Sequence, residues 1–167
     1  MSFDIPYATL KANYASSNTA QGNFVSQRDL FTEIGWEEFL GNPNYRNTCA
    51  IRLSLAIVKS GREVRLGSHR ILKGPHQGKR VEVGMKRLAA LLATPAWLGK
   101  PETLSARTPV NDLRGRRGII AFHGIPGFSG GGHIDLIDPA EGCASDCYFG
   151  AGELWFWPLA VRVRAVA

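Results

Sequence analysis

The sequence predicts an α+β domain in which N-terminal helices pack on a small antiparallel sheet. Up to residue 93 the apolar residues recur at helical spacing, whereas after Pro109 they form short runs rich in Ile, Phe and Trp. Helices that precede a group of strands are the pattern of an α+β domain, and short connections between the strands favour antiparallel neighbours. The 167 residues contain no internal repeat and no long linker, so we expect a single domain over residues 1–167.

Four helical segments are expected in the first part of the chain, each with apolar residues three or four positions apart. The Asn-Pro-Asn stretch at 42–44 ends the second segment, and Gly61 ends the third. Asn47 or Thr48 can cap the third helix, which places Cys49 in its first turn. The expected helices cover residues 7–14, 31–40, 49–60 and 81–93, with a polar loop at 16–22 and a loop or short hairpin at 62–78.

Three apolar runs in the last third of the chain are expected to be strands, because they are rich in Ile, Phe and Trp. They cover Gly118–His123, His133–Ile137 and Glu153–Trp157. Trp155 and Trp157 lie two positions apart and therefore on one face of the last strand. We expect them to pack in the core rather than to form a platform for substrate.

The net charge of +6 and a pI near 9.5 favour anionic partners such as nucleic acid, acidic lipid or bacterial cell wall. The positive residues are scattered, with no basic stripe interleaved with aromatic residues, so we expect no nucleic-acid partner. The longest apolar runs, residues 88–93 and 154–159, are too short to cross a membrane, and no membrane insertion is expected. The first residues lack the pattern of a secretory signal peptide, so a role outside the cytoplasm would require another export route.

Cys49 is the first candidate for catalysis. The three cysteines are interpreted as one pair plus one free thiol, and Cys49 stands apart from Cys143 and Cys147. Unpaired backbone N–H groups and the positive end of the helix dipole favour a thiolate at a helix start. The alternative is a small core residue, because free cysteine is among the most buried residue types.

A histidine beside a thiolate can hold it as an ion pair and later protonate a leaving amine. His69 and His76 lie in the polar middle of the chain and are expected at the surface. His123 ends one apolar strand, whereas His133 opens another, at the end of a segment (124–132) with five glycines. Such a segment lets the backbone approach a ligand closely. These features alone do not choose between His123 and His133.

Several motifs together resemble the fourth family of type VI secretion amidase effectors. They match that family in order and spacing, and the chain length agrees, so the resemblance spans nearly the whole sequence. The motif around the first cysteine is the most specific of them. The motifs are Arg46-Asn47-Thr48-Cys49-Ala50-Ile51-Arg52-Leu53-Ser54, Gly132-His133-Ile134-Asp135-Leu136, Cys143-Ala144-Ser145-Asp146-Cys147 and Glu153-Leu154-Trp155-Phe156-Trp157.

The resemblance implies a papain-like, NlpC-type fold, with the cysteine on a helix packed against a sheet that carries the histidine. It implies an antibacterial effector that the type VI secretion apparatus injects, without a signal peptide, into the periplasm of a target bacterium. There these effectors cut peptidoglycan stem peptides between D-glutamate and meso-diaminopimelate, and a cognate periplasmic immunity protein protects the producer. Cys49 is then the expected nucleophile and His133 its partner, with no cofactor and no metal.

The residue that orients His133 is expected between the two later cysteines, because the resembling family carries an Asp in that loop. Asp146 is the nearest match and is favoured. A slip of one residue in the alignment would put Ser145 in its place. Asp135 is a rival because, two residues beyond His133 on a strand, it points to the same face.

Cys143 and Cys147 are four residues apart, a spacing that a disulfide can span if the loop coils like a helical turn. Such a bond would brace the loop that holds Asp146, and it would form in an oxidising periplasm. Two alternatives remain at this stage. One is a zinc site that uses both cysteines and a histidine, and the other is a pair of reduced structural cysteines.

The expected reaction is attack of the Cys49 thiolate on an amide carbonyl, protonation of the leaving amine by His133, and hydrolysis of the thioester. The backbone N–H of Cys49 is a candidate oxyanion donor. One alternative is another Cys–His acyl transfer, as in a deamidase, transglutaminase or acyltransferase. A second is a non-catalytic module that binds cell wall or nucleic acid and in which Cys49 is only packed.

Overall fold

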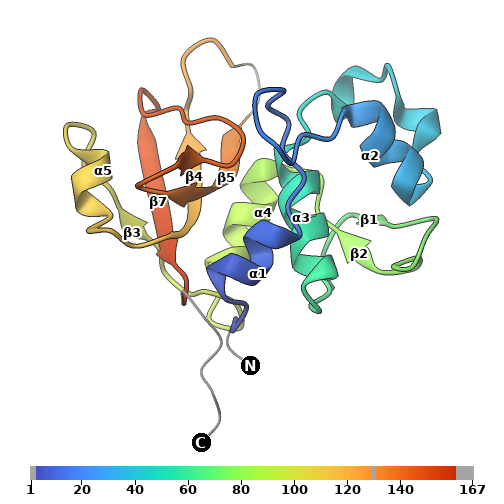
Figure 1. Ribbon diagram of the computed structural model, residues 1–167, viewed down its shortest axis with the longest axis horizontal. Helices are drawn as coiled ribbons and strands as arrows, with labels where there is room; N and C mark the ends of the chain where they lie inside the picture. Colours follow the sequence, from blue (N-terminus) through green and yellow to red (C-terminus); the bar gives the residue numbers. More distant parts are fainter. Residues whose placement is uncertain (1–2, 129–130, 161–167) are drawn as a thin grey trace, which may run out of the picture.

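The computed structural model describes residues 3–128 and 131–160, and it confirms an α+β architecture in which helices precede a small antiparallel sheet (Figure 1). A five-stranded sheet has the order β3-β7-β4-β5-β6, with every neighbouring pair antiparallel. The strands of this sheet are β3 (Glu102–Thr103), β4 (Gly118–His123), β5 (Gly132–Asp138), β6 (Gly142–Cys143) and β7 (Glu153–Pro158). The helices are α1 (Tyr7–Ala12), α2 (Gln27–Ile34), α3 (Cys49–Lys59), α4 (Met85–Leu92) and α5 (Pro109–Asp112), with 3-10 turns η1 (Glu37–Phe39) and η2 (Pro43–Tyr45).

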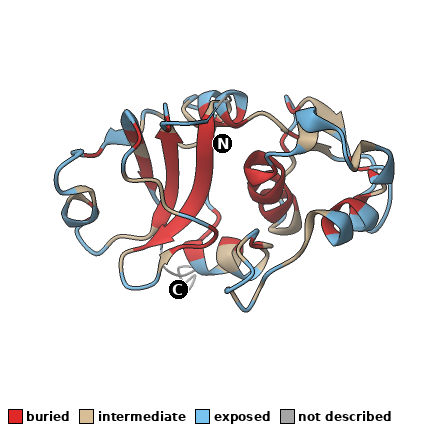
Figure 2. Cartoon of the chain, turned by 90° about the horizontal axis from the view of Figure 1, so that it is seen from above, coloured by how far each residue is buried: buried red, intermediate tan, exposed pale blue. Residues whose placement is uncertain are grey.

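Helix α3 lies at the centre of the molecule, between the sheet and the part built from α2, β1 (His69–Arg70) and β2 (Arg80–Val81) (Figure 1). Every residue from Cys49 to Val58 is buried, and α3 and the long strands are buried through most of their length (Figure 2). One side of α3 packs with β4, β5 and α4, and the other side packs with α2 and the Trp36 region. The helix, with Cys49 as its first residue, is therefore held by packing on both sides.

The long elements lie where the sequence pattern puts them, but several helix ends differ. Helix α1 ends at Ala12, two residues early, and α2 begins at Gln27, four residues early, where Ser26 caps it. Helix α2 ends at Ile34 rather than continuing toward residue 40, because Gly35 adopts a left-handed conformation (φ 79°) and caps the helix. Helix α4 begins at Met85 rather than at residue 81, because Arg80–Val81 pairs with His69–Arg70 as a short hairpin. That hairpin was one of the two structures expected for residues 62–78.

No helix in the described parts of the chain has the length and apolarity needed to span a membrane.

Candidate active site

Cys49 is the first residue of α3, and its side chain is 4% exposed. Its backbone N–H donates to Asn47 Oδ1 at 3.2 Å, and Asn47 Nδ2 donates to the carbonyl of Gly132 at 3.1 Å. The N-cap position itself is Thr48, the other expected cap, whose side chain makes no capping bond. Asn47, one residue earlier, accepts the first N–H of the helix and also ties it to the start of β5. The Cys49 N–H, expected as an oxyanion donor, already has an acceptor in this state.

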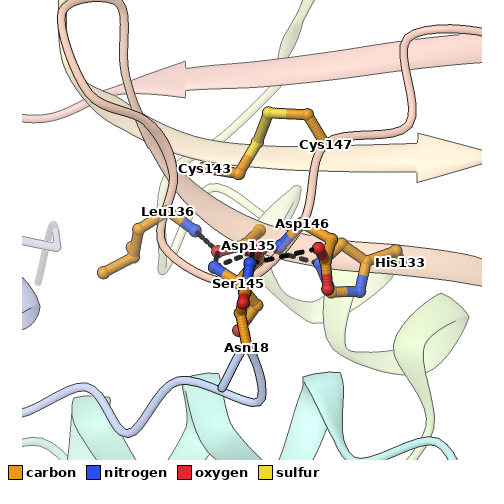
Figure 3. The surroundings of a disulfide bond; sticks show 8 residues. All are labelled: Asn18, His133, Asp135, Leu136, Cys143, Ser145, Asp146 and Cys147. Atoms are coloured by element: carbon orange, nitrogen blue, oxygen red, sulfur yellow. Dashed lines mark hydrogen bonds and ion pairs between the residues drawn. A yellow bond between two sulfur atoms is a disulfide. The ribbon is translucent and has the colours of Figure 1, made fainter. Parts of the chain in front are cut away.

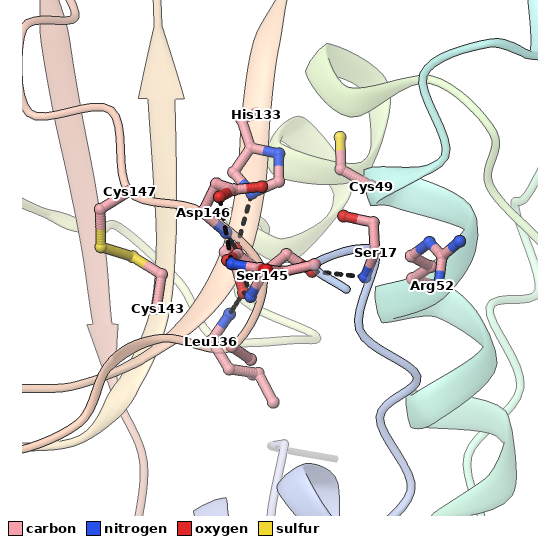
Figure 4. Close-up of polar contacts among 12 residues, drawn as sticks. Ser17, Cys49, Arg52, His133, Leu136, Cys143, Ser145, Asp146 and Cys147 are labelled. Carbon is pink, nitrogen blue, oxygen red and sulfur yellow. Dashed lines mark hydrogen bonds and ion pairs between the residues drawn. A yellow bond between two sulfur atoms is a disulfide. The ribbon is translucent and has the colours of Figure 1, made fainter. Parts of the chain in front are cut away.

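His133 lies on β5 opposite the start of α3 and is 6% exposed. Its Nε2 lies 2.6 Å from Asp135 Oδ2. The opposite side of the ring faces the sulfur of Cys49 (Figure 4). Burial alone would lower the pKa of His133. The hydrogen bonds to Asp135 and Cys49, together with their negative charge, outweigh burial and raise it from 6.5 to about 9. The imidazole is therefore held as an imidazolium at neutral pH, beside the sulfur.

Asp135 is fully buried, and its carboxylate is surrounded by hydrogen-bond donors (Figure 3). Oδ1 accepts from the backbone N–H groups of Leu136 (2.7 Å) and Ser145 (3.2 Å). Oδ2 accepts from the N–H groups of Ser145 (3.1 Å) and Asp146 (3.0 Å), in addition to its contact with His133. These donors fix the carboxylate in one orientation, so the imidazole tautomer and ring plane are fixed as well.

The acceptor that contacts His133 is thus Asp135, the rival on the strand, and not Asp146, which the sequence favoured. The backbone N–H of Asp146 points at Asp135, while its carboxylate accepts only a 3.4 Å bond from Asn18 Nδ2 among the described residues. Ser145, the other alternative, directs its hydroxyl to Tyr14 Oη (3.0 Å) and accepts from the Ser17 N–H (3.1 Å). The loop supports the carboxylate through its backbone, because the strand geometry already places Asp135 on the same face as His133.

Cys143 and Cys147 form a disulfide with a Cα–Cα distance of 5.4 Å, which confirms the expected pairing (Figure 3). The bond closes the loop that carries both Ser145 and Asp146. The zinc alternative is contradicted, because both sulfurs that it required are joined to each other. Among the described residues, no cluster of His, Cys, Asp and Glu is arranged to hold a metal ion.

The remaining histidines lie in other surroundings. His123 packs on Trp155 with a ring-centroid distance of 4.2 Å, and burial lowers its pKa. His69 hydrogen-bonds Tyr45 Oη at 2.8 Å in an aromatic cluster, so it is tied into the fold rather than free at the surface. The structure therefore places His133, and not His123, beside Cys49.

Sequence reasoning missed one residue of this region, Arg52. It lies on α3 one turn beyond Cys49 and is 2% exposed. The signal was present in the sequence, since Arg52 is a charged residue inside a helix whose other residues from Ala50 to Val58 are apolar or small.

Comparison with known proteins gives one family and one set of solved structures. The family described as type VI secretion system amidase effector protein 4 (Tae4) matches residues 45–157. The type VI effector Tae4 from Enterobacter cloacae is similar in structure, with a TM-score of 0.66, 23% identity, and coverage of 95% of this chain and 99% of that chain.

Two effector–immunity complexes are similar as well. The Tae4–Tai4 complex from Enterobacter cloacae matches with a TM-score of 0.66 and 23% identity, over 92% of this chain and 94% of that chain. The Tae4–Tai4 complex from Salmonella Typhimurium matches with a TM-score of 0.63 and 19% identity, over the same shares, 92% and 94%. No curated protein matches by sequence. These structures share the fold of this chain, which confirms the expected NlpC-type, papain-like class.

Proposed function

The chain belongs to the Tae4 family of type VI secretion amidase effectors, and we propose that it hydrolyses the D-glutamyl–meso-diaminopimelate bond of peptidoglycan stem peptides through Cys49, His133 and Asp135. That it is an antibacterial peptidoglycan amidase follows from the family. The bond and the residue roles are the proposal. The single observation that carries it is the buried series Cys49–His133–Asp135, in which one imidazole faces the sulfur and is hydrogen-bonded to a fixed carboxylate.

The reaction uses the two ring nitrogens of His133 separately. Nε2 is bonded to Asp135, which leaves Nδ1 on the side of Cys49 (Figure 4). The thiolate attacks the glutamyl carbonyl carbon, and as the C–N bond breaks, Nδ1–H protonates the diaminopimelate amine. A water molecule then loses a proton to Nδ1 and attacks the thioester, which releases the glutamyl carboxylate and regenerates the thiolate and imidazolium.

Delivery and protection belong to the same proposal. As a type VI effector the protein acts on peptidoglycan in the periplasm of a target bacterium. We infer that injection by the secretion apparatus, rather than a signal peptide, carries it there. Solved Tae4 chains are in complex with the immunity protein Tai4, so we infer a cognate periplasmic immunity protein for this chain. We also infer that residues 1–167 form a single papain-like domain.

Digestion of purified peptidoglycan, followed by mass spectrometry, tests this function. The wild-type protein is expected to release fragments cut between glutamate and diaminopimelate, and in H₂¹⁸O the new glutamyl carboxylate should carry ¹⁸O. Cys49→Ala and His133→Ala are expected to release none. A product joined to a second amine instead of water would indicate acyl transfer. If the wild-type protein and Cys49→Ala both leave the stems intact, the proposal fails.

A further inference from the structure

The guanidinium of Arg52 is buried and is hydrogen-bonded to neutral groups. Its Nη1 donates to three backbone carbonyls, those of Ala15 (3.1 Å), Ser16 (2.9 Å) and Val25 (2.8 Å). Its Nε donates to Thr48 Oγ1 at 2.8 Å. Within residues 3–128 and 131–160, no carboxylate lies at ion-pair distance from it. A buried cation that is paired only with neutral groups is unfavourable, so its retention points to a negative charge elsewhere in its surroundings.

Two groups that can carry a negative charge act on Arg52, namely the Tyr14 hydroxyl and the sulfur of Cys49, which lies one turn earlier on the same helix. Residues three apart on a helix lie on the same face. Burial lowers the pKa of the Arg52 guanidinium, while the charges of Tyr14 and Cys49 act in the opposite direction. Arginine remains protonated in proteins, so this positive charge is permanent.

The other ionisable groups around Cys49 give little compensation for a thiolate. His133 and Asp135 come from β5, Tyr14 from the segment after α1, and Tyr148 from the loop that follows the disulfide. Burial raises the pKa of both tyrosines, which are therefore neutral, and Asp135 supplies no positive charge. His133 is the one cation among these four, and Asp135 already takes part of its charge.

Two of the three carbonyls that Arg52 holds, those of Ala15 and Ser16, belong to a segment that reaches the other half of the site. In this segment (residues 14–18), Ser16 Oγ donates to the Ala144 carbonyl at 2.7 Å and the Ser17 N–H donates to Ser145 Oγ at 3.1 Å (Figure 4). The N–H of Ser145 in turn donates to Asp135. A continuous series of hydrogen bonds therefore runs from the nucleophile helix, through Arg52, to the carboxylate that orients the histidine.

We propose that Arg52 is a positioning residue of the catalytic pair, which balances the charge of the Cys49 thiolate and holds the 14–18 segment against the loop that fixes Asp135. The inference deepens the proposed function and rests on it. It makes two separable claims. The charge claim requires a positive side chain at position 52, and the geometric claim requires a guanidinium, because a lysine cannot reproduce bonds to three carbonyls and a hydroxyl.

Three variants separate these claims. Arg52→Met removes the charge and keeps much of the length, Arg52→Lys keeps the charge, and Ser54→Ala is the matched control. Ser54 is a buried polar residue of the same helix whose hydroxyl donates to the Glu82 carbonyl, away from the site. Iodoacetamide alkylation of Cys49 is followed against pH, and kcat and KM are measured on a defined stem peptide.

Arg52→Met is expected to move the midpoint of the alkylation profile upward by about one pH unit or more, the size of a charge interaction across one helical turn. Its kcat should fall roughly 30-fold or more with little change in KM, because the thiolate and histidine are affected rather than substrate binding. Arg52→Lys should keep the wild-type alkylation midpoint but recover kcat only in part. Ser54→Ala should leave both unchanged.

Two results would overturn the inference. One is an Arg52→Met protein, folded by circular dichroism, whose profile and kcat match Ser54→Ala. The other is an Arg52→Lys protein in which the midpoint of the Cys49 alkylation profile rises by one pH unit or more. If Arg52→Met does not fold, the Arg52→Lys midpoint decides the charge claim. An inactive wild-type protein would instead refute the proposed function, while the alkylation profiles would still test the role of Arg52.

Discussion

Replacement of Asp135 by asparagine removes the charge that orients His133 and keeps the size of the side chain. The carboxylate has no free side, because Oδ1 accepts two N–H groups and Oδ2 accepts two N–H groups and the histidine ring. Whichever oxygen becomes the amide NH₂, at least one backbone donor will face another donor. We therefore expect both the tautomer and the orientation of His133 to be lost.

The magnitude follows from the pKa of His133. A rise from 6.5 to about 9 corresponds to roughly 3 kcal/mol in favour of the imidazolium, which Asp135 and Cys49 supply together. Loss of the Asp135 share lowers the pKa of His133 by one unit or more. Together with the wrong tautomer, this should reduce kcat/KM by on the order of 100-fold or more.

The assay is the pH profile of kcat/KM on a defined stem peptide, and Asp146→Asn is the matched control. In the wild-type protein the alkaline limb is expected near pH 9, where His133 loses its proton. Asp135→Asn should move that limb down by at least one pH unit. Asp146→Asn should stay within about threefold of wild type, because its carboxylate makes only the 3.4 Å contact with Asn18.

Two results would contradict this prediction. A folded Asp135→Asn protein that keeps its alkaline limb near pH 9 would show that the carboxylate does not set the state of His133. A larger loss of kcat/KM in Asp146→Asn than in Asp135→Asn would assign the orienting role to Asp146.

Three further results are expected. Because the pKa of His133 is raised on folding, its stabilising effect is complete below pH 6.5 and is lost as the pH rises through about 9. The free energy of unfolding should therefore fall by up to roughly 3 kcal/mol over that range. His133→Ala should flatten this slope in urea titrations. Reduction of the Cys143–Cys147 disulfide should lower the free energy of unfolding by about 2 kcal/mol, because the bond closes a short loop and restricts the unfolded chain. It should also lower amidase activity several-fold. In a control variant with serine at both positions, dithiothreitol should not change stability. Gly132→Ala should destabilise the fold by roughly 3 kcal/mol or more in thermal melts, because its φ of 137° is unfavourable for alanine and the new Cβ would overlap a carbonyl of β4. The control Gly150→Ala, which has open space around it, should change stability by less than about 0.5 kcal/mol.

The sequence pattern predicted the elements that carry a long apolar signal. Strand β4 matches its expected bounds, and β5 and β7 each differ by a single residue at one or both ends, because apolar runs of six or seven residues rich in Ile, Phe and Trp are a strong signal. Strands β3 and β6 and helix α5 were not predicted, since two to four residues are too few for periodicity. The early end of α2 depended on one conformation, that of Gly35, which the apolar spacing beyond it concealed.

For the site, chemistry and resemblance together favoured Cys49 and His133, which the structure brings together. The residues alone could not choose between Asp135 and Asp146. Strand alternation established only that Asp135 shares a face with His133, while the position of the disulfide loop depends on tertiary packing. Arg52 was missed for a related reason. It contacts backbone carbonyls of segments without regular structure, and such contacts leave no periodic pattern in the sequence.

The hydrogen bonds that join the 14–18 segment to the disulfide loop also constrain the order of folding. Tyr14 and Ser145 are 131 residues apart in the chain, and Ser17 and Ser145 are 128 apart. Contacts at such separation close late, because the entropy of a long loop must be overcome before they form. An intermediate that has folded only its helices would carry the thiol without its histidine. Catalytic competence is therefore a property of the complete native state. Late protection of the Ser145 amide in pulsed hydrogen exchange during refolding would report this last step of assembly.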